Sequence, residues 1–172
     1  MNLEKLKAIT DIATAWIGVV AITAGGGFAV YQYLEKQKED RVKETLLFLD
    51  RYNKTPTLEA RLALDVGWEP YLDAQIKLLK APDFSVAAYR GFMLAAIKEA
   101  KLAGSIDVML DFYEALQICV EKKLCDGDVA VSFFVVDACA TYSQNFSKIE
   151  LERQRRNEPA YGLKLQQFCE AN

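Results

Sequence analysis

Histidine is absent from the 172 residues of this chain. Without imidazole, the protein has no histidine proton shuttle, no Ser-His or Cys-His nucleophile pair and no histidine ligand for zinc. This absence excludes many common hydrolase and zinc-enzyme chemistries.

An excess of basic residues is lacking as well, since 21 lysine and arginine residues stand against 24 acidic ones, with a formal net charge of −3. Duplex nucleic acid requires a concentrated basic surface. We therefore expect no duplex nucleic acid partner, and any anionic ligand has to be bound locally.

The motifs of catalytic and cofactor sites are missing too. The stretch "AGGGFAVYQ" has neither the lysine nor the hydroxyl residue of a phosphate-binding loop, and "DGDVAVSFFVVD" lacks the spacing of a calcium loop. Helix capping accounts for Asp128. We expect no catalytic residue, no metal and no cofactor, and the chain is interpreted as not an enzyme.

Four cysteines lack the C-x-x-C spacing of a zinc site and fall within apolar helical patterns: Cys119, Cys125, Cys139 and Cys169. Free cysteine packs like a small apolar residue. We expect reduced core thiols, with disulfides as the less favoured alternative.

What the chain does have is a long uncharged run, "IATAWIGVVAITAGGGFAVYQY", from Ile12 to Tyr33. As a helix, its length of about 33 Å fits a hydrocarbon core of about 30 Å. A cleaved signal peptide and a buried soluble helix are the alternatives, but the charges before the run cancel. The run predicts an N-terminal transmembrane helix within residues 1–35, in contact with the lipid bilayer.

Basic residues are denser after the run than before it: Lys36, Lys38, Arg41 and Lys43 against Lys5 and Lys7. This asymmetry favours a cytoplasmic side for the C-terminal part of the chain. The expected localisation is the inner membrane, single-pass, with the N-terminus outside and residues 36–172 cytoplasmic.

Small residues form a stripe along one face of the expected span: Gly18, Ala21, Gly25 and Ala29. Such stripes let helices approach closely in lipid, although glycine is also simply tolerated in spans. The stripe predicts a homo-oligomer.

The rest of the chain shows helical periodicity and no alternating strand pattern. We expect a helix continuing from the span to about residue 53, a long helix over 84–104, a central helix over 128–146 capped by Asp128, and a separate polar helix over 147–158. The fold class is all-α, with a compact cytosolic helical domain after the span.

The densest basic cluster comprises Arg153, Arg155 and Arg156, within "ERQRRNE". Acidic residues alternate with these arginines, so a solvated ion-pair face is the default interpretation. The alternative is phosphate recognition, which suits the planar guanidinium group. In that case Tyr142 or Asn145 would lie beside a base.

The segments "RVKETLLFLDRYN" and "LDFYEALQICVEKKLCDGDV" resemble an uncharacterised family of small bacterial membrane-anchored helical proteins. The matching positions are Thr45-Leu46, Leu49 to Tyr52, Tyr113-Glu114 and Asp126, while Lys123 and Cys125 replace the family's glycine and isoleucine. The layout is also similar to small membrane effectors of type III CRISPR antiviral defence, which implies a cytosolic domain that binds cyclic tetra-adenylate.

These features suggest two functions as hypotheses. In the first, the chain is a non-enzymatic, membrane-perturbing effector in antiviral defence that oligomerises and binds a cyclic oligoadenylate. In the second, it is a membrane-anchored adaptor that holds a protein partner in a helical groove.

Overall fold

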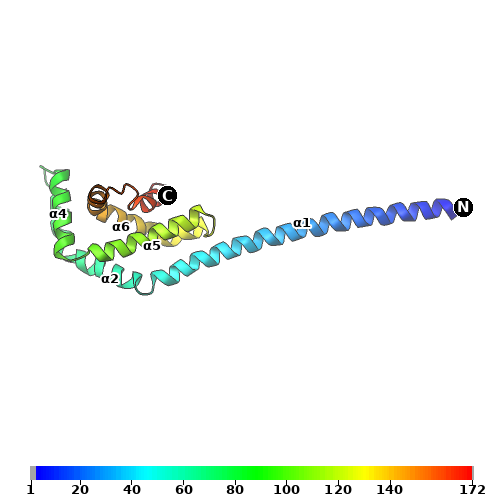
Figure 1. Ribbon diagram of the computed structural model, residues 1–172, viewed down its shortest axis with the longest axis horizontal. Helices are drawn as coiled ribbons and strands as arrows, with labels where there is room; N and C mark the ends of the chain where they lie inside the picture. Colours follow the sequence, from blue (N-terminus) through cyan, green and yellow to red (C-terminus); the bar gives the residue numbers. More distant parts are fainter. Residues whose placement is uncertain (1–2, 172) are drawn as a thin grey trace. The chain divides into compact units, whose positions relative to one another are not determined.

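The computed structural model describes the backbone of residues 3–171 and the side chains of residues 25–171, and every regular element in that part of the chain is a helix. The elements are α1 (Leu3–Tyr52), α2 (Thr57–Trp68), the short 3₁₀ helix η1 (Glu69–Tyr71), α3 (Leu72–Leu79), α4 (Val86–Glu99), α5 (Ala103–Glu121), α6 (Gly127–Arg156) and α7 (Leu163–Glu170) (Figure 1). The all-α prediction is confirmed. Contacts divide the chain into two units, Met1–Asp40 and Arg41–Asn172, whereas the sequence placed the boundary after residue 35.

The predicted transmembrane helix is wrong. Among the residues that the structure describes, no helix combines the length and the apolar character needed to cross a bilayer. The inner-membrane, single-pass localisation built on this helix is therefore corrected as well.

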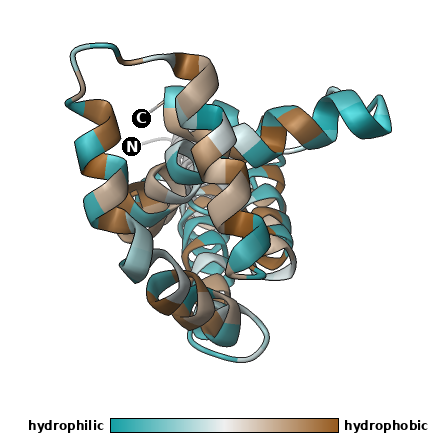
Figure 2. Cartoon of the chain, turned by 90° about the vertical axis from the view of Figure 1, so that its left-hand side faces the viewer, coloured by the Kyte–Doolittle hydropathy of each residue, from teal (hydrophilic) through white to brown (hydrophobic). Residues whose placement is uncertain are grey.

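The core of the unit Arg41–Asn172 forms around α5, which packs against α2, α6 and α7, while α4 packs on α6. The largest buried side chains include Tyr113, Phe134, Met93, Ile106, Leu116, Ile149 and Leu165. Apolar and polar residues alternate along the same helices in Figure 2. This is the pattern of amphipathic helices that each bury one face.

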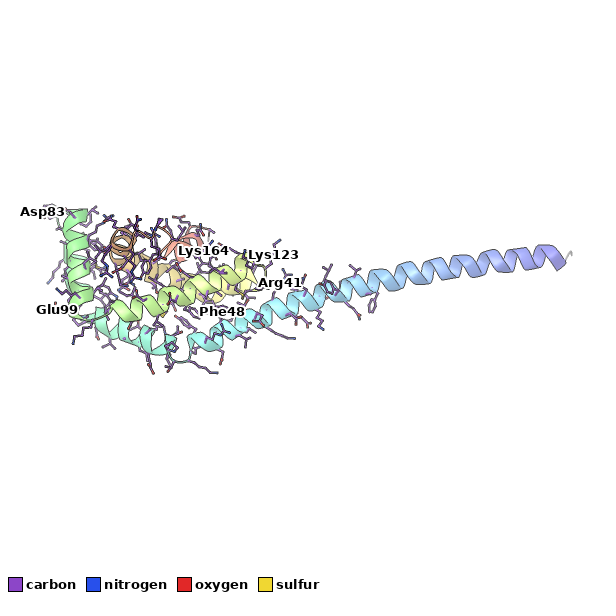
Figure 3. All side chains as sticks on the ribbon, viewed as in Figure 1. Arg41, Phe48, Asp83, Glu99, Lys123 and Lys164 are labelled. Carbon is purple, nitrogen blue, oxygen red and sulfur yellow. A yellow bond between two sulfur atoms is a disulfide. The ribbon has the colours of Figure 1, made fainter. Side chains whose placement is uncertain are left out.

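The last turns of α1 belong to this core. Phe48 lies against α5 (Figure 3), with its ring centroid 5.8 Å from that of Phe112. Tyr52 lies between Phe112 and Phe134, 5.4 and 5.5 Å away. The buried Thr45 hydroxyl accepts a hydrogen bond of 2.8 Å from the backbone N–H of Asp126. These contacts fix the end of α1 to α5 and α6.

Helix ends differ from the sequence-based expectations in three places. Asp126, not Asp128, caps α6, and its carboxylate accepts from the backbone N–H of Val129 at 3.1 Å. The expected helix over 84–104 is α4, which ends at Glu99 and not at Gly104, because Lys101 adopts a φ of 56° that an α-helix does not allow. The expected polar helix is the second half of α6, which runs unbroken to Arg156.

All four cysteines form disulfides, so the interpretation as reduced core thiols is wrong. Cys119 pairs with Cys125 across the turn between α5 and α6, and Cys139 on α6 pairs with Cys169 on α7. The Cα atoms of the two pairs lie 5.2 and 5.4 Å apart, within the usual range for a disulfide. Disulfides of this kind persist in oxidising compartments.

Candidate functional site

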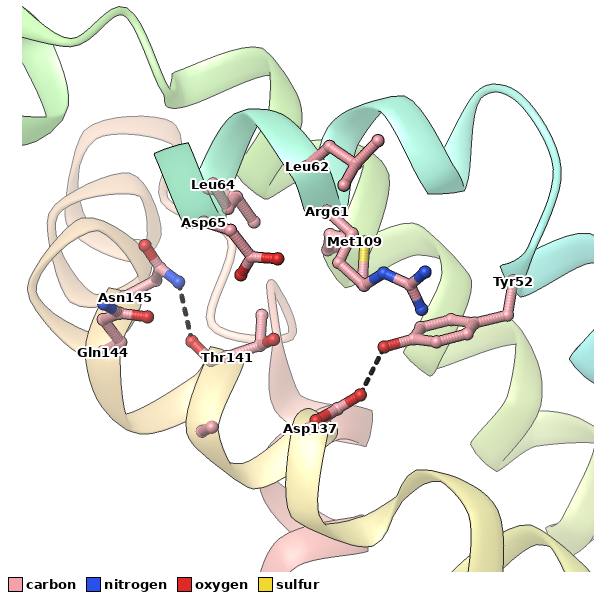
Figure 4. Close-up of a pocket in the computed structure, with 11 residues that line it drawn as sticks. Tyr52, Arg61, Leu62, Leu64, Asp65, Met109, Asp137, Thr141, Gln144 and Asn145 are labelled. Atoms are coloured by element: carbon pink, nitrogen blue, oxygen red, sulfur yellow. Dashed lines mark hydrogen bonds between the residues drawn. The ribbon is translucent and has the colours of Figure 1, made fainter. Parts of the chain in front are cut away.

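A polar pocket of about 410 Å³ opens where the end of α1 meets α2, α5 and α6 (Figure 4). All of its lining residues belong to the unit Arg41–Asn172. They are Tyr52, Arg61, Leu62, Leu64, Asp65, Met109, Asp137, Ala140, Thr141, Gln144 and Asn145.

Helical spacing explains why these polar residues meet. Asp137, Thr141 and Asn145 follow one another at intervals of four along α6, and Arg61 and Asp65 do the same along α2. Residues four apart lie on one face of a helix. Two polar stripes, one on α2 and one on α6, therefore border the same cavity.

Tyr52 closes one end of the pocket. Its hydroxyl donates a hydrogen bond of 2.5 Å to Asp137 Oδ2, and the Arg61 guanidinium lies 4.3 Å from the centre of its ring. Burial raises the pKa of Tyr52 above its ordinary value, so the phenol remains a neutral donor. This bond fixes the position of the Asp137 carboxylate at the pocket.

Asn145 is 1% exposed and lines the opposite end. Its Nδ2 donates to the backbone carbonyl of Thr141 at 2.8 Å, as Figure 4 shows. Its Oδ1 is buried without a hydrogen-bond partner in the structure. Because buried polar atoms are almost always paired, this oxygen marks a place for a donor.

The three predicted arginines lie elsewhere, at the C-terminal end of α6. Arg153 pairs with Glu150 at 2.8 Å, and both Arg155 and Arg156 pair with Glu152, at 2.9 and 2.7 Å. Burial opposes ionisation of Glu152, but the hydrogen bonds from Arg156 and Arg155 outweigh it and hold the pKa of this carboxyl below its ordinary value. None of the three arginines lines the polar pocket.

Only one pair among the other predicted ligand residues comes together. Tyr142 is half-buried, with its ring 5.9 Å from that of Phe146, and burial raises its pKa while the nearby charge of Arg153 opposes this change. Asn145 lies in the polar pocket instead. Sequence reasoning missed Tyr52, Arg61 and Asp65. The available signal was the spacing of Asp137, Thr141 and Asn145 by four residues along α6.

The predicted oligomerisation stripe falls on the unit Met1–Asp40. Gly25 and Ala29 are exposed on α1, while Gly18 and Ala21 lie outside the residues whose side chains the structure describes. Homo-oligomer formation stays a prediction.

An apolar groove of about 440 Å³ lies on another face of the unit Arg41–Asn172, between the end of α1, the start of α2 and α5. It is lined by Phe48, Arg51, Lys54, Thr55, Pro56, Thr57, Val108, Asp111, Phe112 and Ala115. Phe48 and Phe112 form the aromatic contact beneath it, and each is 8% exposed. The groove is preformed and can accept an apolar side chain.

A buried charge cluster joins α5, α6 and the segment before α7. Lys148, which is 5% exposed, donates to Asp107, and the Tyr161 hydroxyl donates to the same carboxylate at 2.5 Å. Burial, together with the bond to Asp107, raises the pKa of Tyr161. Each member is paired within the protein, so the cluster fastens the chain before α7 and offers no reacting atom.

Within the described residues, no group of three potential metal ligands lies close together. Comparison with known proteins found no matching family model, no similar curated protein and no similar solved structure. The resemblances to the uncharacterised bacterial family and to type III CRISPR effectors stay predictions.

Proposed function

We propose that this chain is a non-enzymatic helical adaptor, whose unit Arg41–Asn172 binds a short amphipathic helix of a protein partner in the groove between α1 and α5. The observation that carries the proposal is the apolar groove itself. It is preformed by side chains of three helices and is lined mainly by apolar surface at its floor.

The apolar surface continues beyond the groove along both helices. Leu47 is next to Phe48, four residues before Arg51, and is 48% exposed. Ile118 comes three residues after Ala115 on α5 and is 45% exposed. Residues three and four apart share a helix face, so Leu47 and Ile118 extend the groove at one end. A trough between two helices is the usual dock for the apolar face of a third.

Charges at the groove define the chemistry of the partner helix. Arg51 stands on the α1 side and Asp111 on the α5 side, while Lys54 is paired with Asp50 at 2.7 Å. Electrostatic complementarity then requires acidic residues on one flank of the partner helix and a basic residue on the other. This arrangement sets the orientation in which the helix docks.

The test is selection of a displayed library of helical peptides against the immobilised full chain. We expect enrichment of peptides with large apolar residues on one face and acidic residues on one flank. Leu47→Asp should weaken their binding about tenfold or more, since a charge in an apolar contact costs more than about 1.4 kcal/mol. Arg51→Glu should shift the preferred flank from acidic to basic.

Val136→Asp is the matched control, because Val136 is 78% exposed on α6 and lines neither the groove nor the polar pocket. It should leave peptide binding unchanged. Peptides that bind all three variants equally, or no enrichment at all, would overturn the proposal.

Binding of cyclic tetra-adenylate, and with it a role in antiviral defence, stays a prediction. The pairing of Arg153, Arg155 and Arg156 with glutamates favours the ion-pair interpretation of the cluster over phosphate recognition. A melting temperature of the full chain that rises with cyclic tetra-adenylate, but not with linear tetra-adenylate, would favour the nucleotide hypothesis over the adaptor.

A further inference from the structure

Helix α3 has an apolar face that the unit Arg41–Asn172 leaves open. Leu72, Ile76 and Leu79 recur at intervals of four and three residues, so they form one stripe along the helix. All three are 44 to 49% exposed. Phe84 and Val86, which follow in the turn after α3 and at the start of α4, are exposed as well. Large apolar residues that gather on a surface typically mark an interaction site.

Another side of α3 attaches the helix to its own unit. The Nε2 of Gln75 donates a hydrogen bond of 2.8 Å to the Tyr89 hydroxyl on α4. Leu78, three residues after Gln75, is half-buried. Because these two residues share a side of the helix that differs from the stripe, α3 stays in place while the stripe remains accessible.

Two opposite charges border the stripe on the flank away from Gln75. Asp73 is in the first turn of α3, and Lys80 is the residue at its C-terminal cap. They are about two helical turns apart and therefore lie on the same side of the helix, whereas Lys77 lies further from the stripe. Within the part of the chain that the structure describes, neither Asp73 nor Lys80 forms an ion pair. The flank is negative at one end and positive at the other.

This order of charges is complementary to itself when two copies of α3 run in opposite directions. A two-fold axis close to Ile76 sets Leu72 beside the partner subunit's Leu79. The same axis sets Asp73 opposite the partner subunit's Lys80, and symmetry repeats both contacts at the other end. A parallel pair would set like charges against each other. Charge complementarity therefore favours a second copy of this chain as the occupant of the stripe.

We infer that α3 is a dimerisation helix, which packs antiparallel on α3 of a second copy through the stripe of Leu72, Ile76 and Leu79. One short helix from each subunit covers less than the about 800 Å² a side of a standard interface, so the dimer is weak, with a dissociation constant in the micromolar range. The groove between α1 and α5 contains no residue of α3. Dimer formation and binding of a partner helix can therefore fail independently.

The test is sedimentation equilibrium of the full chain over a range of micromolar concentrations. We expect a monomer–dimer equilibrium. Ile76→Asp should weaken the dimer about tenfold or more, because two added carboxylates would then meet in an apolar contact at the two-fold axis. Val136→Asp is the matched control, since Val136 is 78% exposed on α6, and it should dimerise as the unchanged protein does.

Charge reversals test the antiparallel arrangement and leave the apolar stripe intact. Asp73→Lys and Lys80→Asp should each weaken the dimer about three- to tenfold at low salt and less at high salt, because each turns two attractive pairs into repulsive ones. Both reversals in one chain should restore the dimer, since opposite charges then face each other again. An equimolar mixture of the two single variants should associate more strongly than either variant alone.

A monomer at every concentration would overturn the inference, as would equal association of Ile76→Asp and Val136→Asp. A double reversal that stays as weak as the single reversals would overturn the antiparallel arrangement, and with it the inference. Unchanged melting temperatures show that weaker association is not a folding defect. Should Ile76→Asp melt early, the charge reversals decide, since Asp73 and Lys80 are exposed.

Discussion

Aromatic side chains of the two units lie in opposite environments. Phe28, Tyr31 and Tyr33, on the part of α1 that belongs to Met1–Asp40, are 62 to 66% exposed. Phe112 and Phe134, in the other unit, are 8% exposed or less. The same residue class thus stabilises one unit by burial and contributes no such energy to the described part of the other.

The difference teaches what holds each helical segment together. Helices in the unit Arg41–Asn172 gain stability by packing an apolar face, whereas residues 25–40 rely on hydrogen bonds within the helix. Four variants or variant pairs test this contrast, in descending order of effect.

Truncation of a core aromatic residue should have the largest effect. Phe134→Ala should lower the free energy of unfolding by about 3 to 5 kcal/mol, because it removes a fully buried ring and leaves a cavity. Phe28→Ala should change it by less than about 0.5 kcal/mol. Urea denaturation followed by tyrosine and tryptophan fluorescence measures both. Equal losses would show that Phe28 is packed.

Loss of a disulfide should destabilise only the unit Arg41–Asn172. The Cys139–Cys169 bond closes a loop of 30 residues, so replacing both cysteines by alanine should cost about 2 to 4 kcal/mol. The matching double variant of Cys119 and Cys125, whose separation is 6, should cost less, since a shorter loop constrains the unfolded chain less. Thermal denaturation compares the two. The opposite ranking would contradict the expected dependence on loop length.

An added methyl group should have opposite effects on stability in the two units. A Cβ at Gly67 would collide with the side chain of Leu102, which is 3% exposed, whereas a Cβ at Gly26 would meet nothing within 4 Å. Gly67→Ala should therefore cost about 1 to 3 kcal/mol of stability. Gly26→Ala should instead favour the helix by about 0.5 to 1 kcal/mol. Circular dichroism distinguishes a gain in helix content from a shift in melting temperature. A lower helix content in Gly26→Ala would refute this account.

The smallest effect concerns Glu114, a half-buried residue on α5. Burial raises the pKa of this carboxyl, and its Oε1 has no hydrogen-bond partner in the structure. A raised folded-state pKa stabilises the fold below the unfolded pKa of about 4.3, and this stabilisation is lost as pH rises through the folded value. Glu114→Gln should therefore raise the melting temperature at pH 7 and give little gain at pH 4. The same gain at both pH values would exclude ionisation as the cause.

Local pattern was sufficient for the helices but not for several of their ends. The sequence predicted a helix to about residue 53, and α1 ends at Tyr52. It placed the break between α4 and α5 at Gly104, whereas the chain leaves the helical conformation at Lys101, because glycine is the usual signal for a positive φ and lysine gives none. The uncharged run at residues 12–33 predicted a membrane span, but no helix among the described residues has the apolar length for one.

Most of the candidate site could not be predicted from the sequence, because its residues come from helices far apart in the chain. The sequence marks Asn145 as a ligand residue, but its neighbours Tyr52 and Arg61 come from helices more than 80 residues earlier in the chain. The arginine cluster stands out because it is dense in sequence. Its glutamate partners are equally close in sequence, which is why the ion-pair interpretation is available from the sequence alone.

The sequence by itself determined the all-helical class, the amphipathic faces and the lack of histidine chemistry, because these depend on residue type and on spacing of three or four residues. Only the tertiary structure decided which cysteines pair, which polar stripes share a pocket and which apolar faces remain open. Those outcomes depend on distances between helices far apart in the chain, and a local pattern does not contain them.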